Sequence, residues 1–158
     1  MKKLTPRIAK SIAFKYSKEE KNKMERDFAL IHAEAVVKIS KILAKRLGAN
    51  VSIVEACGWV HDIGKIVEME NHAEHSVSLL EKEKIEVTQQ IKDCILNHAT
   101  SGKPLSPEAK IIQMADKMSI LSIPVLKLIL EQKKITESDV EFVNKMVTGS
   151  VNYLKNLI

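Results

Sequence analysis

Apolar residues recur at intervals of three and four along almost the whole chain of 158 residues. This spacing aligns them on one side of successive α-helices, whereas a β-strand would alternate apolar and polar residues. Only five glycines and four prolines interrupt the pattern. We therefore predict an all-α fold, a compact helical bundle without internal repeats or an interdomain linker.

Capping residues indicate where the first helices begin and end. Thr5 followed by Pro6 predicts the start of a helix that extends to about residue 15. Ser17 and Glu20 have the spacing of a capping box and predict a long helix that ends at Gly48. Further helices are expected at residues 52–62, 72–83, 88–98 and 107–121.

Three more boundaries follow from residues that interrupt or begin a helix. Gly64 is predicted to stop the helix at 52–62 by adopting a positive φ angle. Pro124 is predicted to break or kink the next helix. Thr136, with Asp139 three residues later, is predicted to open the C-terminal helix.

Composition narrows the class of partner. The net charge of +5 favours anionic partners such as nucleotides and phosphate esters, but the basic residues are spread along the chain. Aromatic residues are only 4% of the chain, too few for the stacking surfaces that bind single-stranded nucleic acid. We expect no sequence-specific nucleic-acid recognition.

Location is predicted from the chain start, the cysteines and the apolar segments. The residues MKKLTPRIAK lack the apolar stretch of a secretory signal, and Cys57 and Cys94 are interpreted as buried thiols. The longest apolar segment, residues 118–130, is interrupted by Pro124 and Lys127 and is too short to cross a bilayer. A cytoplasmic protein without membrane contact is predicted.

His32 lies on the apolar side of its expected helix, together with Phe28, Ala35, Val36, Ile39 and Leu43. A buried imidazole needs a partner. A single buried histidine more often forms a hydrogen bond to a carbonyl oxygen in the core than it serves as a metal ligand.

The segment WVHDIGK favours a ligand role for His32. His61 and Asp62 end an apolar helix and bring an imidazole and a carboxylate together where the backbone turns. A solvated His-Asp pair at a helix end is the simpler alternative, although aspartate is unfavourable at the C-terminus of a helix.

Geometry then brings three elements to one place. If the helices on either side of Gly48 fold back on each other, His32 and His61 differ in height by roughly one helical turn. Asp116 adjoins the apolar face of a later helix and needs a cation or several donors if it is buried. Two imidazoles and two carboxylates suit a divalent transition metal that keeps open positions for water.

Further histidines could supply ligands for a second metal. His72 and His75 lie three residues apart on one helical face, and His98 ends the helix IKDCILNH.

The order His32, His61-Asp62, His72, His98, Asp116 closely resembles the HD superfamily, which is named after the adjacent His-Asp pair. The resemblance covers roughly residues 28 to 120 and includes HAEAVVKISKILAKRLGAN before ACGWVHDIGK. The segments NHAEHSVSLL and NHATSGKPLSPEAKIIQMADKMS are similar to the subset with two metals, including bacterial hydrolases of diadenosine tetraphosphate. The resemblance implies one HD domain over residues 1–158, its core at about 28–120, with N- and C-terminal helices packing on it.

The resemblance also implies the metal ligands. It assigns the first metal to His32, His61, Asp62 and Asp116 and a second to Asp62, His72 and His98. His75 competes with His72, which we prefer because His-x-x-x-Ser followed by apolar residues matches the family's second-metal segment. Manganese, iron, nickel, cobalt and zinc all tolerate such ligands, in one or two copies.

The activity implied is that of a phosphohydrolase. A metal-activated water would attack the phosphorus of a phosphomonoester or phosphoanhydride, with a nucleotide as the expected substrate. Asp62 is the catalytic carboxylate, and Lys65 is the candidate that holds phosphate and offsets charge in the transition state. An exposed lysine favouring a helix C-terminus explains Lys65 equally well. Lys103 could also contact phosphate, although a lysine beside Gly102 and Pro104 is ordinarily just a loop residue.

Two alternatives to catalysis remain open at this point. HD-like folds also serve as non-catalytic regulatory or nucleotide-binding modules, although every ligand position is retained in this sequence. A structural or RNA-associated protein with a basic surface is the other alternative. The chain could also form a homodimer.

Overall fold

The structure, a computed structural model, describes residues 1–131 and 136–155. Within these residues it contains eight α-helices, one 3-10 helix and two short strands. The elements are β1 (Lys2–Lys3), α1 (Pro6–Ser17), α2 (Lys23–Leu47), α3 (Val51–Val60), η1 (Ile63–Ile66), α4 (His72–Lys82), β2 (Ile85–Glu86), α5 (Gln89–Leu96), α6 (Pro107–Ser119), α7 (Ile123–Leu130) and α8 (Glu137–Lys155). The all-α prediction is confirmed.

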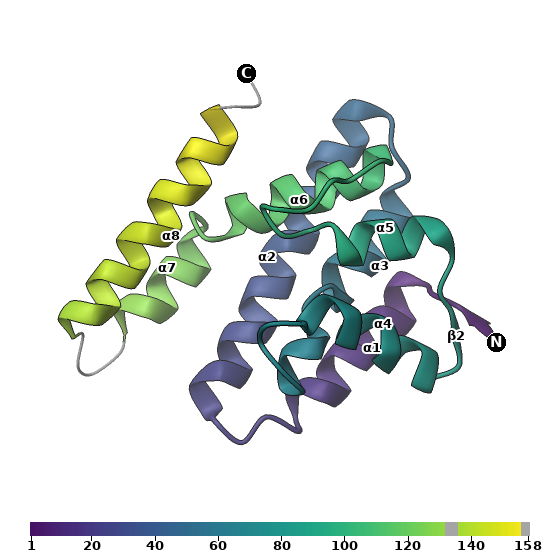
Figure 1. Cartoon of the computed structure of the whole chain (residues 1–158), viewed down its shortest axis with the longest axis horizontal. Coiled ribbons are helices and arrows are strands. Elements are labelled where there is room, and N and C mark those ends of the chain that lie inside the picture. Colours follow the sequence, from purple (N-terminus) through teal and green to yellow (C-terminus); the bar gives the residue numbers. More distant parts are fainter. Residues whose placement is uncertain (132–135, 156–158) are drawn as a thin grey trace.

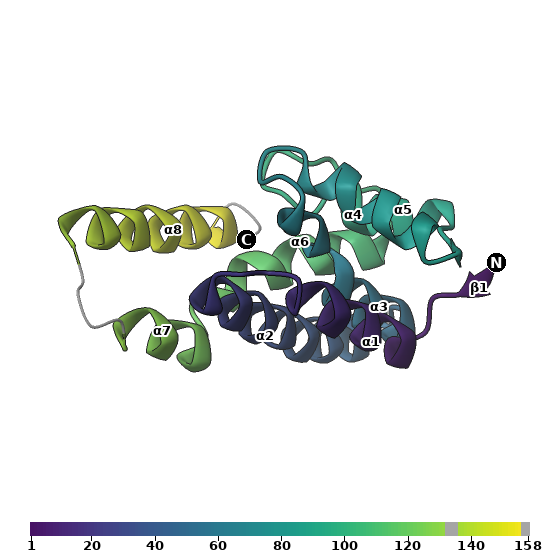
Figure 2. The ribbon, with the colours of Figure 1, turned by 90° about the horizontal axis from the view of Figure 1, so that it is seen from below.

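The helices form two layers with α6 between them. Helices α1, α2 and α3 lie in one layer, and α4 and α5 lie in the other (Figure 2). Helices α7 and α8 both lie at the same end of the molecule, and Figure 2 shows them apart from each other (Figures 1 and 2). Helix α7 contacts α2, whereas α8 contacts α6.

The turn between α2 and α3 is closed by backbone geometry and one side chain. Gly48 has a φ of 70° and its N–H donates to the carbonyl oxygen of Ala44, as expected for a glycine that ends a helix. Asn50 then caps α3, because its Oδ1 accepts from the N–H groups of Ser52 at 3.1 Å and Ile53 at 3.2 Å. The two helices therefore pack side by side, as predicted.

The predicted capping box at Ser17 and Glu20 is wrong. Ser17 is the last residue of α1, and its hydroxyl donates to the carbonyl oxygen of Phe14 at 3.0 Å. Asn22 caps α2 instead and accepts from the N–H of Met24 at 3.0 Å. The Glu20 carboxylate accepts from the N–H of Asn22 at 2.8 Å, so it supports the residue that caps the helix.

The predicted role of Gly64 is also wrong. Helix α3 ends at Val60, and Gly64 lies in η1 without a positive φ angle. A Cβ atom at Gly64 would lie 2.0 Å from the carbonyl oxygen of His72 and 2.5 Å from the amide nitrogen of Ser76. Gly64 is required because α4 approaches this turn too closely for any side chain.

Of two further predicted boundaries, one differs from prediction and one agrees with it. Pro124 lies in the first turn of α7, where its missing N–H costs nothing, so it begins this helix and does not kink it. Helix α8 starts at Glu137, directly after Thr136, in agreement with prediction. The side chain of Asp139 lies outside the described residues.

A short parallel pairing of β1 with β2 was not predicted. Lys2 pairs with Ile85 and Lys3 with Glu86, and the N–H of Lys2 donates to the carbonyl oxygen of Lys84 at 2.8 Å. Strands of two residues leave no alternating pattern in the sequence.

The core fills the space between the layers. It includes Ala9, Ala44, Val54, Leu80, Ile95, Ala109 and Ile112, each fully buried. Cys57 and Cys94 are also buried and form no disulfide with each other, in agreement with prediction. No described helix combines the length and the apolar character that crossing a membrane requires.

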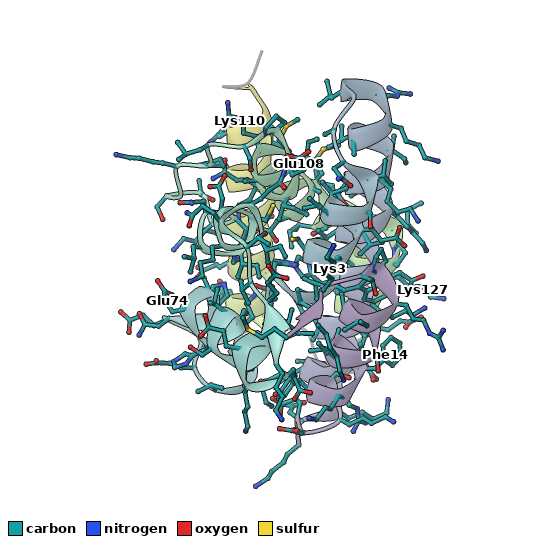
Figure 3. The ribbon with its side chains drawn as sticks, turned by 90° about the vertical axis from the view of Figure 1, so that its right-hand side faces the viewer. Lys3, Phe14, Glu74, Glu108, Lys110 and Lys127 are labelled. Carbon is teal, nitrogen blue, oxygen red and sulfur yellow. The ribbon has the colours of Figure 1, made fainter. Side chains whose placement is uncertain are left out.

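Glu108 is a buried acid that joins three parts of this core. Its Oε1 accepts from the N–H of Asn50 at 2.8 Å, and its Oε2 accepts from the side-chain amide of Gln90 at 2.8 Å. Burial alone would raise the pKa of Glu108, but the hydrogen bonds from Asn50, from its own N–H and from Gln90 outweigh burial and lower it. Lys110, on the same helix, is exposed (Figure 3).

Replacing Glu108 should therefore destabilise the fold. Glu108→Ala leaves two donors without their acceptor, and we expect the free energy of unfolding in urea to fall by about 1–3 kcal/mol. Because the folded pKa is lowered, the wild-type contribution is present above the usual glutamate pKa and is lost as the pH falls through the lowered value. Lys110→Ala, the matched control, should change stability by at most about 0.5 kcal/mol. Equal effects of the two variants would contradict this role.

Candidate metal centre

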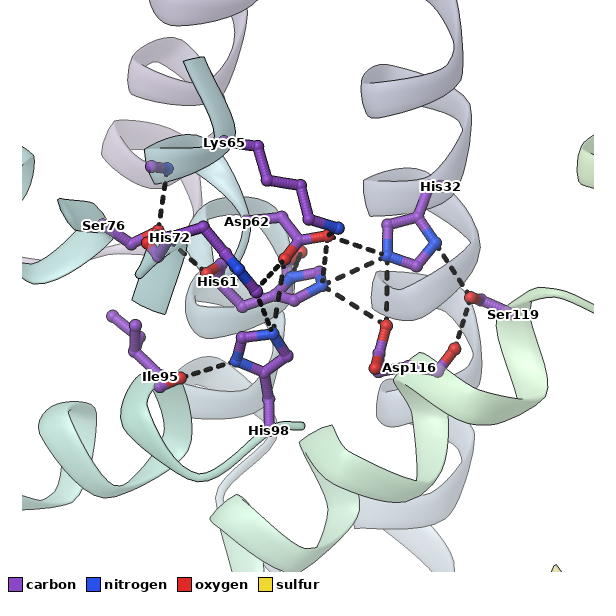
Figure 4. A network of polar contacts seen from close by, with 12 residues as sticks. His32, His61, Asp62, Lys65, His72, Ser76, Ile95, His98, Asp116 and Ser119 are labelled. Carbon is purple, nitrogen blue, oxygen red and sulfur yellow. Dashed lines mark hydrogen bonds and ion pairs between the residues drawn. The ribbon is translucent and has the colours of Figure 1, made fainter. Parts of the chain in front are cut away.

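Six histidine and aspartate side chains from five segments converge between the two layers (Figure 4). Their potential ligand atoms form two groups, within each of which all ligand atoms lie within 4.8 Å of one another. The first group contains His32, His61, Asp62 and Asp116, and the second contains Asp62, His72 and His98. All six residues named from the sequence are thus brought together.

The first group is centred on two imidazole nitrogens. His32 Nε2 and His61 Nε2 lie 3.2 Å apart. His32 Nε2 also lies 3.2 Å from Asp116 Oδ1 and 3.3 Å from Asp62 Oδ2. Helix α2 supplies His32, the end of α3 supplies the His-Asp pair and α6 supplies Asp116. Donor atoms from three elements therefore face one point.

The second group repeats this arrangement with α4 and the end of α5. His72 Nε2 and His98 Nε2 lie 3.0 Å apart. Each also lies close to Asp62 Oδ1, at 3.2 Å for His72 and 3.3 Å for His98.

Asp62 is common to both groups and divides its two oxygens between them. Oδ2 faces the first group, whereas Oδ1 faces the second. Oδ1 is buried and has no well-directed hydrogen bond from any residue that the structure describes. A buried carboxylate oxygen without such a donor needs a cation, so the residues present fit divalent metal ions at this place.

The second ring nitrogens of three histidines are held by backbone carbonyls. Each Nδ1 donates to the carbonyl oxygen three residues earlier: His61 to Gly58 at 3.0 Å, His72 to Met69 at 2.7 Å and His98 to Ile95 at 2.6 Å. A proton on Nδ1 leaves the lone pair on Nε2, which is the nitrogen that faces the centre of the site. These contacts fix the tautomer that a metal ligand requires.

His32 is oriented by a side chain. Its Nδ1 lies 3.0 Å from the hydroxyl oxygen of Ser119, and that hydroxyl donates to the carbonyl oxygen of Asp116 at 2.6 Å. Since the hydroxyl proton is used on Asp116, the Ser119 oxygen accepts from His32 Nδ1. Sequence reasoning did not identify Ser119 in this role, although its position three residues after Asp116 places it on the same face of α6.

Ser76 holds the His-Asp turn against α4. Its Oγ accepts from the N–H of Gly64 at 2.9 Å and lies 2.9 Å from the carbonyl oxygen of His61 and 2.8 Å from that of His72. Buried Ser76 therefore fixes the distance between the two groups.

Charge is concentrated at the centre of the site. Burial would raise the pKa of Asp62, but His61, Lys65 and the neighbouring histidines outweigh burial and hold it well below the usual range. Burial would also raise the pKa of Asp116, but the neighbouring His32 outweighs burial and holds it well below the usual range. Both acids are therefore ionised. Burial lowers the pKa of His61, whereas Asp116 and Asp62 overcome burial and raise the pKa of His32 to about 9.

His75 lies outside both groups. Its Nε2 is 3.2 Å from Glu68 Oε2, and about a third of its side chain is exposed. Of the two competing histidines, only His72 faces Asp62.

A pocket of about 330 Å³ opens onto the two groups. Its lining includes Lys65, whose Nζ lies 2.5 Å from Asp62 Oδ2. Lys117 also lines it and contacts Asp116 Oδ2 at 2.7 Å. Lys103 is exposed and does not line this pocket. Sequence reasoning missed Lys117, although its position next to Asp116 was a usable signal.

Known proteins similar to this chain carry the same domain. Residues 29–121 match the family described as HD domain. A deoxyguanosinetriphosphate triphosphohydrolase-like protein of Caldanaerobacter subterraneus is 30% identical over 59% of this chain and 33% of its own length. Ribonuclease Y of Fervidobacterium nodosum is 31% identical over 57% of this chain and 18% of its own length. The chain thus spans a third or less of these two relatives.

A solved structure extends the likeness to the whole fold. The crystal structure of a predicted HD superfamily hydrolase from an uncultured Thermotogales bacterium aligns with a TM-score of 0.63. It is 17% identical and covers 96% of this chain and 90% of its own, so it supports the fold alone. Because the family match spans more than half of the sequence and includes the His-Asp pair, this chain belongs to the HD domain family.

Proposed function

We propose that this protein is a metal-dependent phosphohydrolase that cleaves a phosphomonoester or phosphoanhydride bond of a nucleotide. The division of the Asp62 oxygens between two pairs of imidazole nitrogens carries the proposal, because it is suited to two neighbouring divalent ions. The relative whose name includes triphosphohydrolase supports a phosphate substrate. We also infer that residues 1–158 form one HD domain whose core spans about 28–120.

The first ion would be held by His32, His61, Asp62 and Asp116, and the second by Asp62, His72 and His98. This mixed set of nitrogen and oxygen donors suits manganese, iron, nickel, cobalt or zinc. Ions bound there would lower the pKa of water and polarise the phosphoryl oxygens.

Lys65 would bind the phosphoryl group beside the metals. Burial opposes its charge, but Asp62 outweighs burial and raises the pKa of Lys65. Lys65 therefore stays protonated, so it donates hydrogen bonds to phosphoryl oxygens and stabilises negative charge, but does not accept a proton. Lys117 also contacts an acid of the first group, because its Nζ lies 2.7 Å from Asp116 Oδ2.

A second candidate is hydrolysis of a phosphodiester in RNA. The relatives named Ribonuclease Y favour this substrate, and the net charge of +5 would attract it. Release of phosphate from nucleotides, compared with cleavage of a short labelled RNA by the same protein, distinguishes the two. RNA binding that depends strongly on salt and survives Asp62→Ala would favour a non-catalytic role.

Asp62→Ala tests the site as a whole. The substitution removes the oxygens that both groups share, so we expect bound metal to be lost and phosphate release to fall by more than about 100-fold. Metal content would be measured by mass spectrometry after reloading with each candidate metal, and turnover on a nucleotide panel. Folding would be checked by circular dichroism.

His75→Ala is the matched control, because His75 contacts Glu68 and lies outside both groups. It should keep wild-type metal content and turnover. An Asp62→Ala protein that is folded and still binds two metal equivalents would refute the proposed centre.

Ser119→Ala tests the orientation of His32. Without the hydroxyl oxygen, His32 Nδ1 loses its acceptor, and we expect metal affinity to fall by about 10–100-fold in a competition titration with a chelating dye. Ser78→Ala, at an exposed serine on α4, should leave affinity unchanged. Restored affinity in Ser119→Thr would support an orienting hydroxyl over a packing effect.

The raised pKa of His32 predicts opposite pH trends for metal binding and for stability of the metal-free protein. Metal must displace a proton from His32, so affinity should rise as the pH approaches about 9. The charged His32 stabilises the metal-free fold below its unfolded pKa of 6.5, and this contribution is lost as the pH rises through about 9. Chelator titrations and urea unfolding at several pH values check both trends; metal affinity that is constant from pH 7 to 9 would contradict them.

A further inference from the structure

Helix α8 contributes to the pocket from outside the matched domain. The family match ends at residue 121, but Lys145 and Gly149 of α8 line the same pocket as His32 and Asp116. Lys145 and Gly149 are four residues apart, so they lie on the same face of α8.

Gly149 is unusual for the interior of a helix, where glycine is unfavourable. Its φ angle is not positive, so the backbone conformation does not require glycine. A Cβ atom built there would meet nothing within 4 Å among the described residues, so close packing does not require glycine either. The absent side chain does leave open space in the pocket.

Lys145 differs from the other two lysines of the pocket. Lys65 contacts Asp62 and Lys117 contacts Asp116, so each is paired with an acid of the site. Lys145 is exposed and forms no ion pair with any residue in the described ranges. Divalent ions in the two groups would add further positive charge. The complete pocket would therefore favour a ligand with more negative charge than one phosphoryl group carries.

The rest of the lining is suited to an apolar part of the same ligand. Phe28 lies parallel to the His32 ring, with ring centroids 5.8 Å apart and an interplanar angle of 3°, and both Phe28 and Ile120 line the pocket. The pocket volume of about 330 Å³ is near the lower end of the range for small-molecule sites. It suits one nucleoside with its phosphates better than two nucleosides.

We propose that the face of α8 carrying Lys145 and Gly149 is a substrate-recognition subsite for a single nucleoside polyphosphate. Lys145 binds a phosphate beyond the one held at the histidine and aspartate groups, and Gly149 leaves room for the remainder of the ligand. This inference rests on the proposed phosphohydrolase function and adds to it the substrate class and the element that selects it.

The test measures binding by calorimetry to the metal-loaded protein. The probes are orthophosphate and adenosine 5′-(α,β-methylene)diphosphate, whose methylene bridge resists hydrolysis. We expect the wild type to bind the nucleotide analogue more tightly than orthophosphate. Lys145→Ala should weaken binding of the analogue by about three- to fivefold. Gly149→Leu should weaken it by at least about tenfold, because the leucine side chain fills the open space. Orthophosphate binding should not change in either variant.

Two controls separate recognition from folding. Lys127→Ala removes the same charge from an exposed position on α7, outside this pocket, and should bind both probes as the wild type does (Figure 3). Gly149→Leu should keep or raise the thermal midpoint, because leucine favours a helix over glycine.

The outcomes distinguish this inference from the proposed function. Wild-type affinity for the analogue in both Lys145→Ala and Gly149→Leu would overturn the subsite, as would a wild type that binds orthophosphate but not the analogue. Orthophosphate binding that is independent of metal and unaffected by Asp62→Ala would overturn the proposed function itself.

Discussion

The two oxygens of Asp62 face two different pairs of histidines, and the structure around the site is arranged to allow this. The second pair reaches Asp62 only because α4 and the end of α5 approach the turn after α3. Gly64 makes that approach possible, since a Cβ atom would lie 2.0 Å from the carbonyl oxygen of His72. Ser76 of α4 then contacts the turn at two places, because its Oγ accepts from the N–H of Gly64 and donates to the carbonyl oxygen of His61. Gly64 and Ser76, which are not among the candidate metal ligands, thus determine the distance between the two ligand groups.

Buried charge is the second constraint. Asp62 and Asp116 are almost fully buried, and burying an ionised carboxylate is costly unless cations face it. Lys65, Lys117 and a protonated His32 supply that charge within the chain itself. Divalent ions would supply additional positive charge and would compete with a proton for the ring nitrogen of His32. Metal affinity, stability and pH are therefore linked through the same few contacts.

The proposed metal centre and the proposed recognition subsite lie in different parts of the chain. The ligand groups lie within the region matched to the HD domain family, from α2 to α6. The pocket wall contributed by α8 lies beyond that region and carries Lys145 and Gly149. Recognition of this chain's own ligand is expected to depend on α8.

The sequence alone determined the helical class, the turn at Gly48 and the six residues that meet in the site, because these depend on periodicity, local capping and the order of ligand-type side chains. It did not determine why Gly64 is glycine, which residue orients His32 or that Lys145 reaches the pocket. Those features depend on the distance between elements far apart in the chain: α4 from the turn after α3, Ser119 from α2, and α8 from the metal centre. Local sequence patterns do not determine distances between elements that are far apart in the chain, so only the packing of the helices against one another decided them.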